Sequence, residues 1–134
     1  MIGREAKPYD RAAPPCRLLL VSGHRAGSEA LLAHLAHHGF AIVAHETNAA
    51  EAAEKARSER PDVVLIDAAV PGGWQAVVSA LDGLTPRDHI AVLAAYWGEA
   101  ARLAASRTGI GATLLMRVEG VELVNRLRAL GGVA

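Results

Sequence analysis

Short apolar runs alternate with segments of helical periodicity along most of the chain. Five runs have the length and aliphatic content typical of buried strands, bounded by glycine, proline or polar residues. They are Arg17–Val21, Phe40–Ala44, Val63–Ile66, Ile90–Ala95 and Thr113–Met116. Five further segments have the apolar spacing or the composition of helices. They are Ser28–His38, Ala49–Ser58, Trp74–Leu81, Glu99–Arg107 and Val121–Leu130.

This alternation predicts the fold class. Strands that alternate with helices at short spacing favour a parallel sheet with helices on both faces, joined by right-handed crossovers. We therefore expect an α/β, flavodoxin-like (βα)5 three-layer sandwich, with a five-stranded parallel sheet in the order 2-1-3-4-5. Residues 1–15 mix charges with prolines and are expected to form a flexible N-terminal tail, followed by one domain over 16–134.

Local signals mark several helix ends. Ser28 precedes the first helical segment and is expected to cap it, and Gly39 is expected to end it. Asn48 with Glu51 three residues later has the form of a capping box. These signals support the predicted helix boundaries.

Composition narrows the classes of function. Fourteen basic residues balance fourteen acidic ones, so general electrostatics give no case for nucleic-acid or membrane-surface binding. The single cysteine, Cys16, cannot form an internal disulfide, which fits a reducing compartment. No stretch has the apolar length of a membrane span, and the sequence predicts a cytoplasmic protein.

Asp67 is the first candidate for a functional residue. It ends the third apolar run, between Pro61 and the breakers Pro71–Gly73. In open α/β sheets, ligands bind outside the carboxyl ends of the strands, where this carboxylate is expected to lie. An aspartate at such a position also commonly accepts N–H bonds in a turn, so both interpretations stay open.

Four segments resemble the receiver domains of two-component response regulators, over nearly all of Arg17–Leu130. They read LLLVSGHR, AEAAEKARSERPDVVLIDAAVPGG, IAVLAAYWGEA and IGATLLMR. The resemblance implies that residues 16–134 form a receiver-like domain and that Asp67 is the phosphoacceptor candidate. The family commonly carries Pro-Gly beyond this aspartate, as Pro71-Gly72 do here.

The chain departs from the family pattern at the other chemical positions. Receivers carry two acidic residues after the first strand, where this chain has Ser22 and Gly23. The family's Ser or Thr at the end of the fourth strand is matched by Ala94, which has no hydroxyl. The nearest residue to the family's lysine is Arg117, one residue early in the best register.

These departures predict a degenerate receiver, or pseudo-receiver. Mg²⁺ prefers oxygen ligands, above all carboxylates, so a normal metal site is not expected and Mg²⁺ would bind weakly if at all. We expect no catalytic residues, no enzyme activity beyond self-phosphorylation of Asp67, and no other cofactor. Asp67 is then expected to cap the strand end or to bond to the turn at Ser22-Gly23.

The resemblance also suggests how such a domain would act. Receivers dimerise or bind partners through the fourth and fifth helices and the strand between them, so the expected partners are a second copy, a signalling protein or a histidine kinase. Tyr96 and Trp97 are candidate aromatic contacts. The arginines that could surround them are Arg102, Arg107, Arg126 and Arg128. Alternatively, Trp97 packs over the sheet edge and the arginines are solvated.

Other interpretations remain. One is a conventional phosphoaccepting receiver. Another is a cobalamin-binding flavodoxin-like domain, because SGHRAG at 22–27 resembles a loop that presents a histidine, here His24, to cobalt. His34, His37 and His38 are neighbours on a helix, but without acidic or cysteine ligands a solvated face is the simpler interpretation. An acid–base pair of Asp67 and His24 has no independent support.

Overall fold

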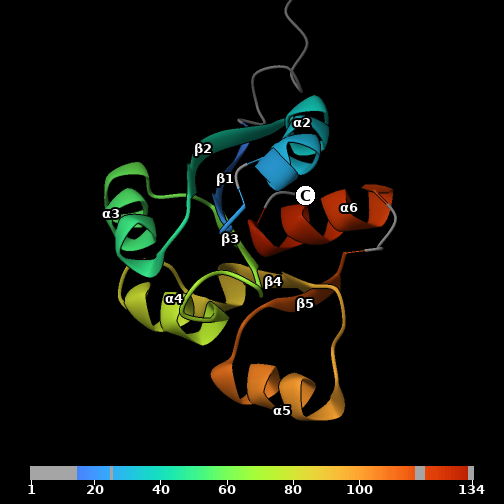
Figure 1. Cartoon of the computed structure of the whole chain (residues 1–134). Coiled ribbons are helices and arrows are strands. Elements are labelled where there is room, and N and C mark those ends of the chain that lie inside the picture. The colour runs from blue at the N-terminus through green and yellow to red at the C-terminus, as the bar shows by residue number, and fades with distance from the viewer. Residues whose placement is uncertain (1–14, 25, 117–119, 133–134) are drawn as a thin grey trace, which may run out of the picture.

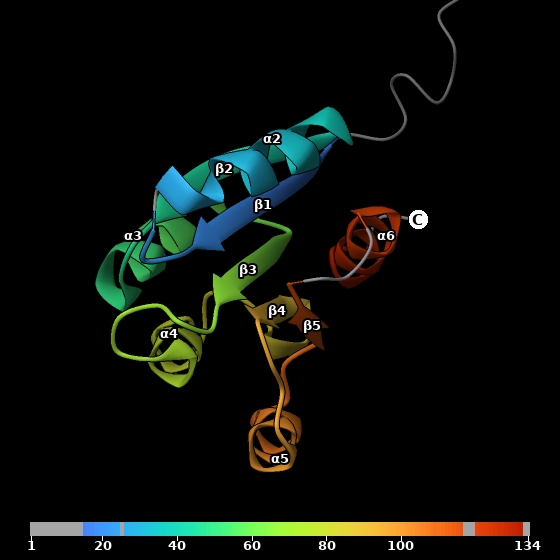
Figure 2. The same cartoon turned by 45° about the vertical axis from the view of Figure 1, so that its right-hand side comes forward.

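The predicted alternation of strands and helices is present. The computed structural model describes residues 15–24, 26–116 and 120–132. Five parallel strands form one sheet in the order β2-β1-β3-β4-β5, which lies between two layers of helices (Figures 1 and 2). The fold class and the strand order predicted from the sequence are therefore confirmed.

The elements follow one another as strand and helix. The strands are β1 (Cys16–Val21), β2 (Phe40–Glu46), β3 (Val63–Asp67), β4 (Ile90–Ala94) and β5 (Ala112–Leu115). The helices are α2 (Glu29–His37), α3 (Ala49–Glu59), α4 (Trp74–Ala80), α5 (Glu99–Thr108) and α6 (Gly120–Leu130). Single 3₁₀ turns at Ala26–Ser28 and Arg87–His89 precede α2 and β4.

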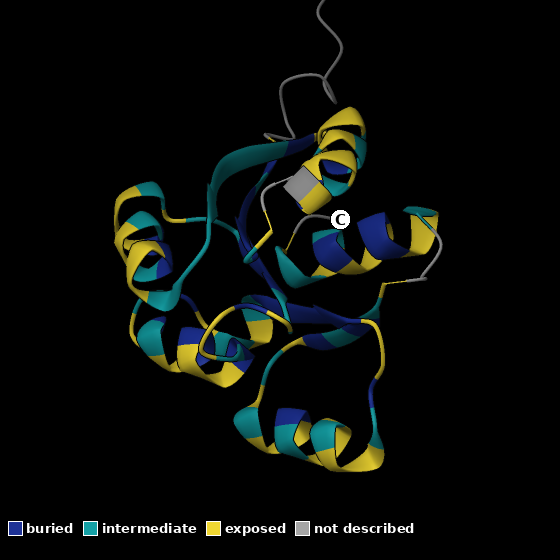
Figure 3. Ribbon diagram, in the orientation of Figure 1, coloured by how far each residue is buried: buried dark blue, intermediate teal, exposed yellow. Residues whose placement is uncertain are grey.

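Alternate residues of the buried strands supply two separate cores. In β1, Leu18 and Leu20 face α2 and α6, whereas Leu19 and Val21 face α3, α4 and α5. This is the consequence of the two-residue period of a strand in a sheet covered on both faces. Figure 3 shows the buried colour concentrated in the central strands and exposed residues on the outer sides of the helices.

The edge strand β2 is longer than predicted. It continues to Glu46, two residues beyond the predicted end at Ala44, because β1 pairs with it as far as Val21. The Ser22 N–H extends this pairing by donating to the Glu46 carbonyl at 2.9 Å. Hydrogen bonding to a neighbouring strand, which no local pattern encodes, thus decides the length.

One predicted cap is present and another is not. Asn48 Oδ1 accepts the Glu51 N–H at 2.9 Å, as the capping-box pattern predicts. Gly39 has a φ of +92°, which suits the left-handed end of α2. Ser28 stands at the start of α2 but makes no side-chain cap bond, because its hydroxyl is engaged elsewhere. Ser28 therefore occupies the predicted N-cap position, but the side-chain hydrogen bond expected of a cap is absent.

The predicted tail, residues 1–15, lies outside the described residues except for Pro15, which is exposed. Among the helices that the structure does describe, none has the length and apolar character needed to cross a membrane.

Candidate functional site

Asp67 lies at the carboxyl end of β3, in the middle of the sheet. Its Oδ1 accepts the Ala69 N–H at 2.9 Å, and its main-chain carbonyl accepts the Val70 N–H at 3.0 Å. The Ser22 hydroxyl lies 3.5 Å from Oδ2, a long hydrogen bond. The expected capping of the strand end and the expected bond to the Ser22 turn are both present.

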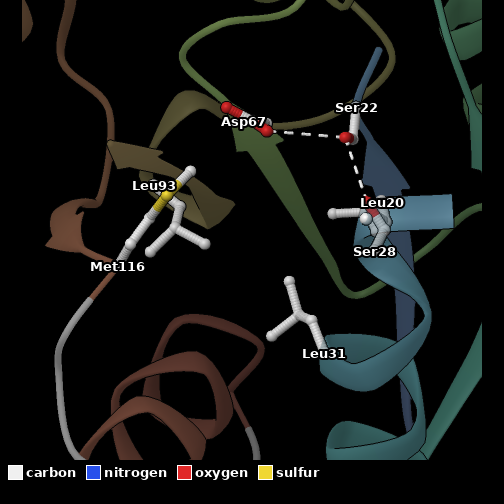
Figure 4. Close-up of a pocket in the computed structure, with 8 residues that line it drawn as sticks. Leu20, Ser22, Ser28, Leu31, Asp67, Leu93 and Met116 are labelled. Carbon is white, nitrogen blue, oxygen red and sulfur yellow. Dashed lines mark hydrogen bonds between the residues drawn. The ribbon is translucent and has the colours of Figure 1, made fainter. Parts of the chain in front are cut away.

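Ser22 is the centre of a small polar network after β1. Its side chain is 1% exposed, and its Oγ accepts the His24 N–H at 3.2 Å. The Ser28 hydroxyl lies 3.1 Å from Ser22 Oγ (Figure 4) and 2.8 Å from the His24 carbonyl. A hydroxyl offers one proton and two lone pairs, so protein groups use most of the bonding capacity of Ser22.

Gly23 lies directly beneath the loop that follows Asp67. A Cβ on Gly23 would come within 2.7 Å of Pro71 Cδ, a distance that real Cβ atoms do not show. Pro71 begins the Pro-Gly-Gly turn, in which Gly72 and Gly73 have φ values of +85° and +87°. No side chain, acidic or otherwise, fits at Gly23 unless this turn moves.

Ala94 and Leu93, at the end of β4, face opposite sides of the sheet. Ala94 is buried in the core beneath α3, α4 and α5. Leu93 is paired in register with Asp67 and faces the side of α2 and α6. The end of β4 therefore brings a leucine, not a hydroxyl, to the side of the sheet on which Asp67 lines a pocket.

The pocket beside Asp67 has a volume of about 240 Å³. Its polar wall is Ser22, Ser28 and Asp67, and Figure 4 shows Met116, Leu93 and Leu31 around the opposite side. Its lining comes from β1, the start of α2, β3, β4 and the residue after β5. They are Leu20, Ser22, Gly27, Ser28, Leu31, Asp67, Leu93 and Met116.

No protein-family model and no curated protein matches the sequence. Solved structures do match. The receiver domain of NarL from Mycobacterium tuberculosis is 21% identical with a TM-score of 0.77, and 88% of this chain covers 97% of it. The BeF3-activated receiver domain of RstA from Klebsiella pneumoniae is 23% identical with a TM-score of 0.75, at coverages of 86% and 97%.

A LuxR-family two-component response regulator from Aurantimonas sp. SI85-9A1 has a higher identity, 28%, with a TM-score of 0.74. The match covers 87% of this chain and 86% of that one. The chain has the receiver-domain fold. The position of Asp67 at the end of the third strand of this fold agrees with the resemblance seen in the sequence.

Within the receiver fold, the two predicted aromatic contacts have opposite environments. Trp97 is 6% exposed, packs edge-to-face on Trp74 with ring centroids 6.1 Å apart, and donates its indole N–H to the Leu114 carbonyl at 2.9 Å. Tyr96 is 79% exposed. The prediction that Trp97 serves as an interface contact is therefore wrong, because its ring fills the core and its polar atom is bonded there.

The four predicted arginines do not form one ring around the aromatic residues. Arg102 donates Nε–H to the Trp97 carbonyl at 3.2 Å and so binds the loop before α5. Arg128 lies on the other side of the molecule, where it donates to the His38 carbonyl and its guanidinium stands over the Phe40 ring. Arg107 and Arg126 are exposed. The predicted lysine equivalent, Arg117, lies outside the described residues.

His24 is exposed beside the network, with its main chain bound to Ser22 and Ser28. The neighbours described above are all receiver or response-regulator structures, so they lend no support to cobalamin binding through His24.

His34, His37 and His38 form a cluster at the end of α2. The ring centroids of His34 and His38 are 4.6 Å apart, and those of His37 and His38 are 5.2 Å apart. Partial burial, followed by the charges of His34, His37 and Arg128, lowers the pKa of His38. Among the described residues, no group of three or more histidine, cysteine or acidic side chains could hold a metal ion.

Two features of the site were missed from the sequence. Gly23 and Pro71 are 48 residues apart in number, and only the tertiary structure puts them in contact. The pocket likewise combines Leu31 of α2 with Met116 after β5. Strand alternation could have placed Leu20 and Leu93 on one face of the sheet, but not the hollow between them and α2.

Proposed function

We propose that this chain is an atypical receiver domain of two-component-type signalling that acts in the cytoplasm through protein–protein contacts. In this proposal Asp67 undergoes weak or no Mg²⁺-dependent phosphorylation, and the domain has no other enzymatic activity. The contact of Gly23 with Pro71 carries the proposal, because the position at which receivers hold an acidic residue has no space for a side chain.

The oxygen donors near Asp67 do not suit Mg²⁺. The ion requires octahedral oxygen coordination and retains several waters, usually with one or two carboxylates. Here one carboxylate has an oxygen bonded to the Ala69 N–H, and Ser22 is occupied by its own network. The pocket beside them is lined largely by Leu20, Leu31, Leu93 and Met116, which provide no oxygen ligand.

The end of β4 supports the same proposal. A hydroxyl that follows the phosphoryl group is part of the family's switch, as the resemblance implies, and Ala94 offers none. Its methyl group packs in the core with Trp97. We infer that any switching of the β4–α5 loop is independent of phosphate.

The face that contains α5, β5 and α6 is the proposed contact surface, for a second copy or for a signalling partner such as a histidine kinase. Large apolar side chains are exposed on α5 and α6, on the loop before α5 and directly after β5. They are Tyr96 (79% exposed), Leu103 (51%), Met116 (49%) and Val121 (65%). Aromatic and aliphatic groups of this kind are the usual energetic centres of interfaces.

Phosphorylation is tested by incubating the protein with acetyl phosphate and Mg²⁺ and measuring its intact mass. We expect no stoichiometric phosphoryl adduct under conditions that fully modify a conventional receiver used as a positive control. A stoichiometric adduct that is lost in Asp67→Ala would overturn the proposal.

The contact surface is tested by light scattering of the wild type, Tyr96→Ala and Val121→Glu. If the surface mediates homodimerisation, the wild type is a dimer and both variants shift to the monomer mass. Glu54→Ala, an exposed position on α3, is the matched control and should leave the mass unchanged. A dimer that survives both substitutions, or a monomeric wild type, contradicts homodimerisation through this face.

A further inference from the structure

The pocket beside Asp67 has room for a ligand of about one ring. Its volume of about 240 Å³ equals roughly eight water molecules at about 30 Å³ each. Its walls come from the carboxyl ends of β1, β3 and β4, from the residue after β5 and from α2. Leu31 faces Leu93 and Met116 across the hollow in Figure 4. A compact molecule of this size fits the hollow.

The walls of the pocket are mainly apolar. Leu20, Leu31, Leu93 and Met116 supply side chains without hydrogen-bonding groups, and burying a ligand's hydrocarbon against them is favourable at about 25 cal/mol for each Å². Inorganic phosphate or a hydrated cation would leave its own hydration unreplaced there. The apolar lining therefore favours an organic ligand with a hydrocarbon portion.

Asp67 supplies the charge of the pocket. Its Oδ1 is bonded to the Ala69 N–H, whereas among the described residues Oδ2 has the Ser22 hydroxyl as its one partner, at 3.5 Å, and keeps acceptor capacity. No lysine or arginine among the described residues forms an ion pair with Asp67. The pocket thus offers one carboxylate oxygen at the end of an apolar hollow, and a cationic hydrogen-bond donor complements it.

We propose that this pocket binds a small organic cation, a primary or secondary ammonium group on an apolar body of about one ring. The ammonium donates to Asp67 Oδ2, and the body packs between Leu31, Leu93 and Met116. This inference rests on the proposed function, since an Asp67 that is not committed to Mg²⁺ and phosphate is free to bind another cation.

The test uses benzylamine as the probe, added to the ¹⁵N-labelled full chain at neutral pH, where the amine is protonated. We expect saturable shifts of the amide signals of Ser22, Ala69 and Met116, with a Kd on the order of 1 mM for a ligand of this size. Benzyl alcohol, which has the same shape without the charge, should bind at least tenfold more weakly. Equal binding of the alcohol, or no saturable shift with benzylamine, overturns the proposal.

Two variants test separately how the carboxylate charge and the apolar lining contribute to ligand affinity. Asp67→Asn preserves size and the Oδ1 acceptor and should weaken benzylamine at least tenfold, whereas Asp88→Asn, an exposed aspartate outside the pocket, should leave the Kd unchanged. Met116→Ala shortens a half-exposed wall residue and should weaken binding about three- to tenfold. Unchanged affinity in Asp67→Asn contradicts the proposed binding mode.

The outcomes distinguish this inference from the proposed function. Absence of benzylamine binding removes the ligand site and leaves the phosphorylation result unaffected. A stoichiometric phosphoryl adduct on Asp67 removes the proposed function, while amine binding by the unphosphorylated protein is still read from the amide shifts.

Discussion

The two halves of the carboxyl edge of the sheet differ in how their residues are used. After β1 and β3, the polar groups of Ser22, Ser28 and Asp67 bond mainly to one another and to nearby main chain. After β4 and β5, the large side chains that the structure describes are apolar or aromatic, with Trp97 buried, Tyr96 79% exposed and Met116 49% exposed. The half after β1 and β3 therefore has the polar residues of a chemical site, whereas the half after β4 and β5 has exposed apolar and aromatic side chains.

This contrast shows that a carboxylate at the end of a buried strand does not by itself make a metal site. Asp67 lies at the end of β3, and its neighbours are a serine network and a glycine in close contact with proline. The serine hydroxyls bond to one another and to nearby main chain, so among these groups Asp67 alone is left with a free acceptor site, and one carboxylate oxygen does not provide the ligand set that Mg²⁺ requires. Contact with a partner, by contrast, needs only exposed groups such as those of the β4–β5 half.

The largest expected effect separates the two aromatic neighbours. Trp97→Ala removes a buried indole and its bond to the Leu114 carbonyl, so the free energy of unfolding should fall by about 3–5 kcal/mol. Tyr96→Ala should change it by no more than about 0.5 kcal/mol, because the ring is exposed. Urea unfolding followed by circular dichroism measures both, and similar losses would contradict the contrast.

An acidic residue at Gly23 tests the steric block in the first half. Gly23→Asp places a Cβ against the rigid Pro71 ring, and we expect a loss of about 1–3 kcal/mol in unfolding free energy. In the Pro71→Ala background the same substitution should cost less, since the ring atoms that it meets are gone. Additive effects in this double-mutant cycle would show that the contact does not matter.

The serine network should contribute less. Ser28→Ala removes the hydroxyl that bonds to the His24 carbonyl, with an expected cost of about 1 kcal/mol. Ser58→Ala removes an exposed hydroxyl with a weak bond to Lys55 and should cost less than about 0.5 kcal/mol. Denaturation midpoints at equal m-values compare the two, and an equal cost would argue against the network.

The smallest effect at neutral pH concerns Cys16, at the opposite end of β1. Burial, then the Asp62 carboxylate, raise the pKa of its thiol to about 11, from 9.0, against a smaller lowering by Arg128. The folded state therefore holds the proton more tightly, and this contribution to stability is complete below pH 9 and lost as pH rises toward 11.

Thiol labelling checks this directly. Native protein at pH 8 should react with a disulfide reagent far more slowly than unfolded protein, because Cys16 is 3% exposed and its thiolate is scarce. The same rate in both states would contradict the burial. Labelling also serves as a reference for the variants above, since it reports opening of the structure away from the site.

Much of the fold was predictable because its signals are local. The predicted apolar runs Arg17–Val21, Val63–Ile66 and Ile90–Ala95 have strand length, and the capping pattern at Asn48 lies within four residues. The predictions failed where distant segments decide. The length of β2 depends on its pairing with β1. The Ser28 side chain is an exception, because its hydroxyl bonds to the His24 carbonyl only four residues away in place of the helix cap.

The candidate site divides in the same way. The sequence alone determined the fold class and the place of Asp67 at the end of a buried strand. It also determined that no acidic residue directly follows the first strand. These features follow from strand periodicity and residue chemistry, which can be read from the order of the residues. Only the tertiary structure decided that Gly23 has no room for a side chain, that Trp97 is core and Tyr96 surface, and that an apolar pocket adjoins Asp67. Each depends on contacts between segments far apart in the chain, which no local pattern records.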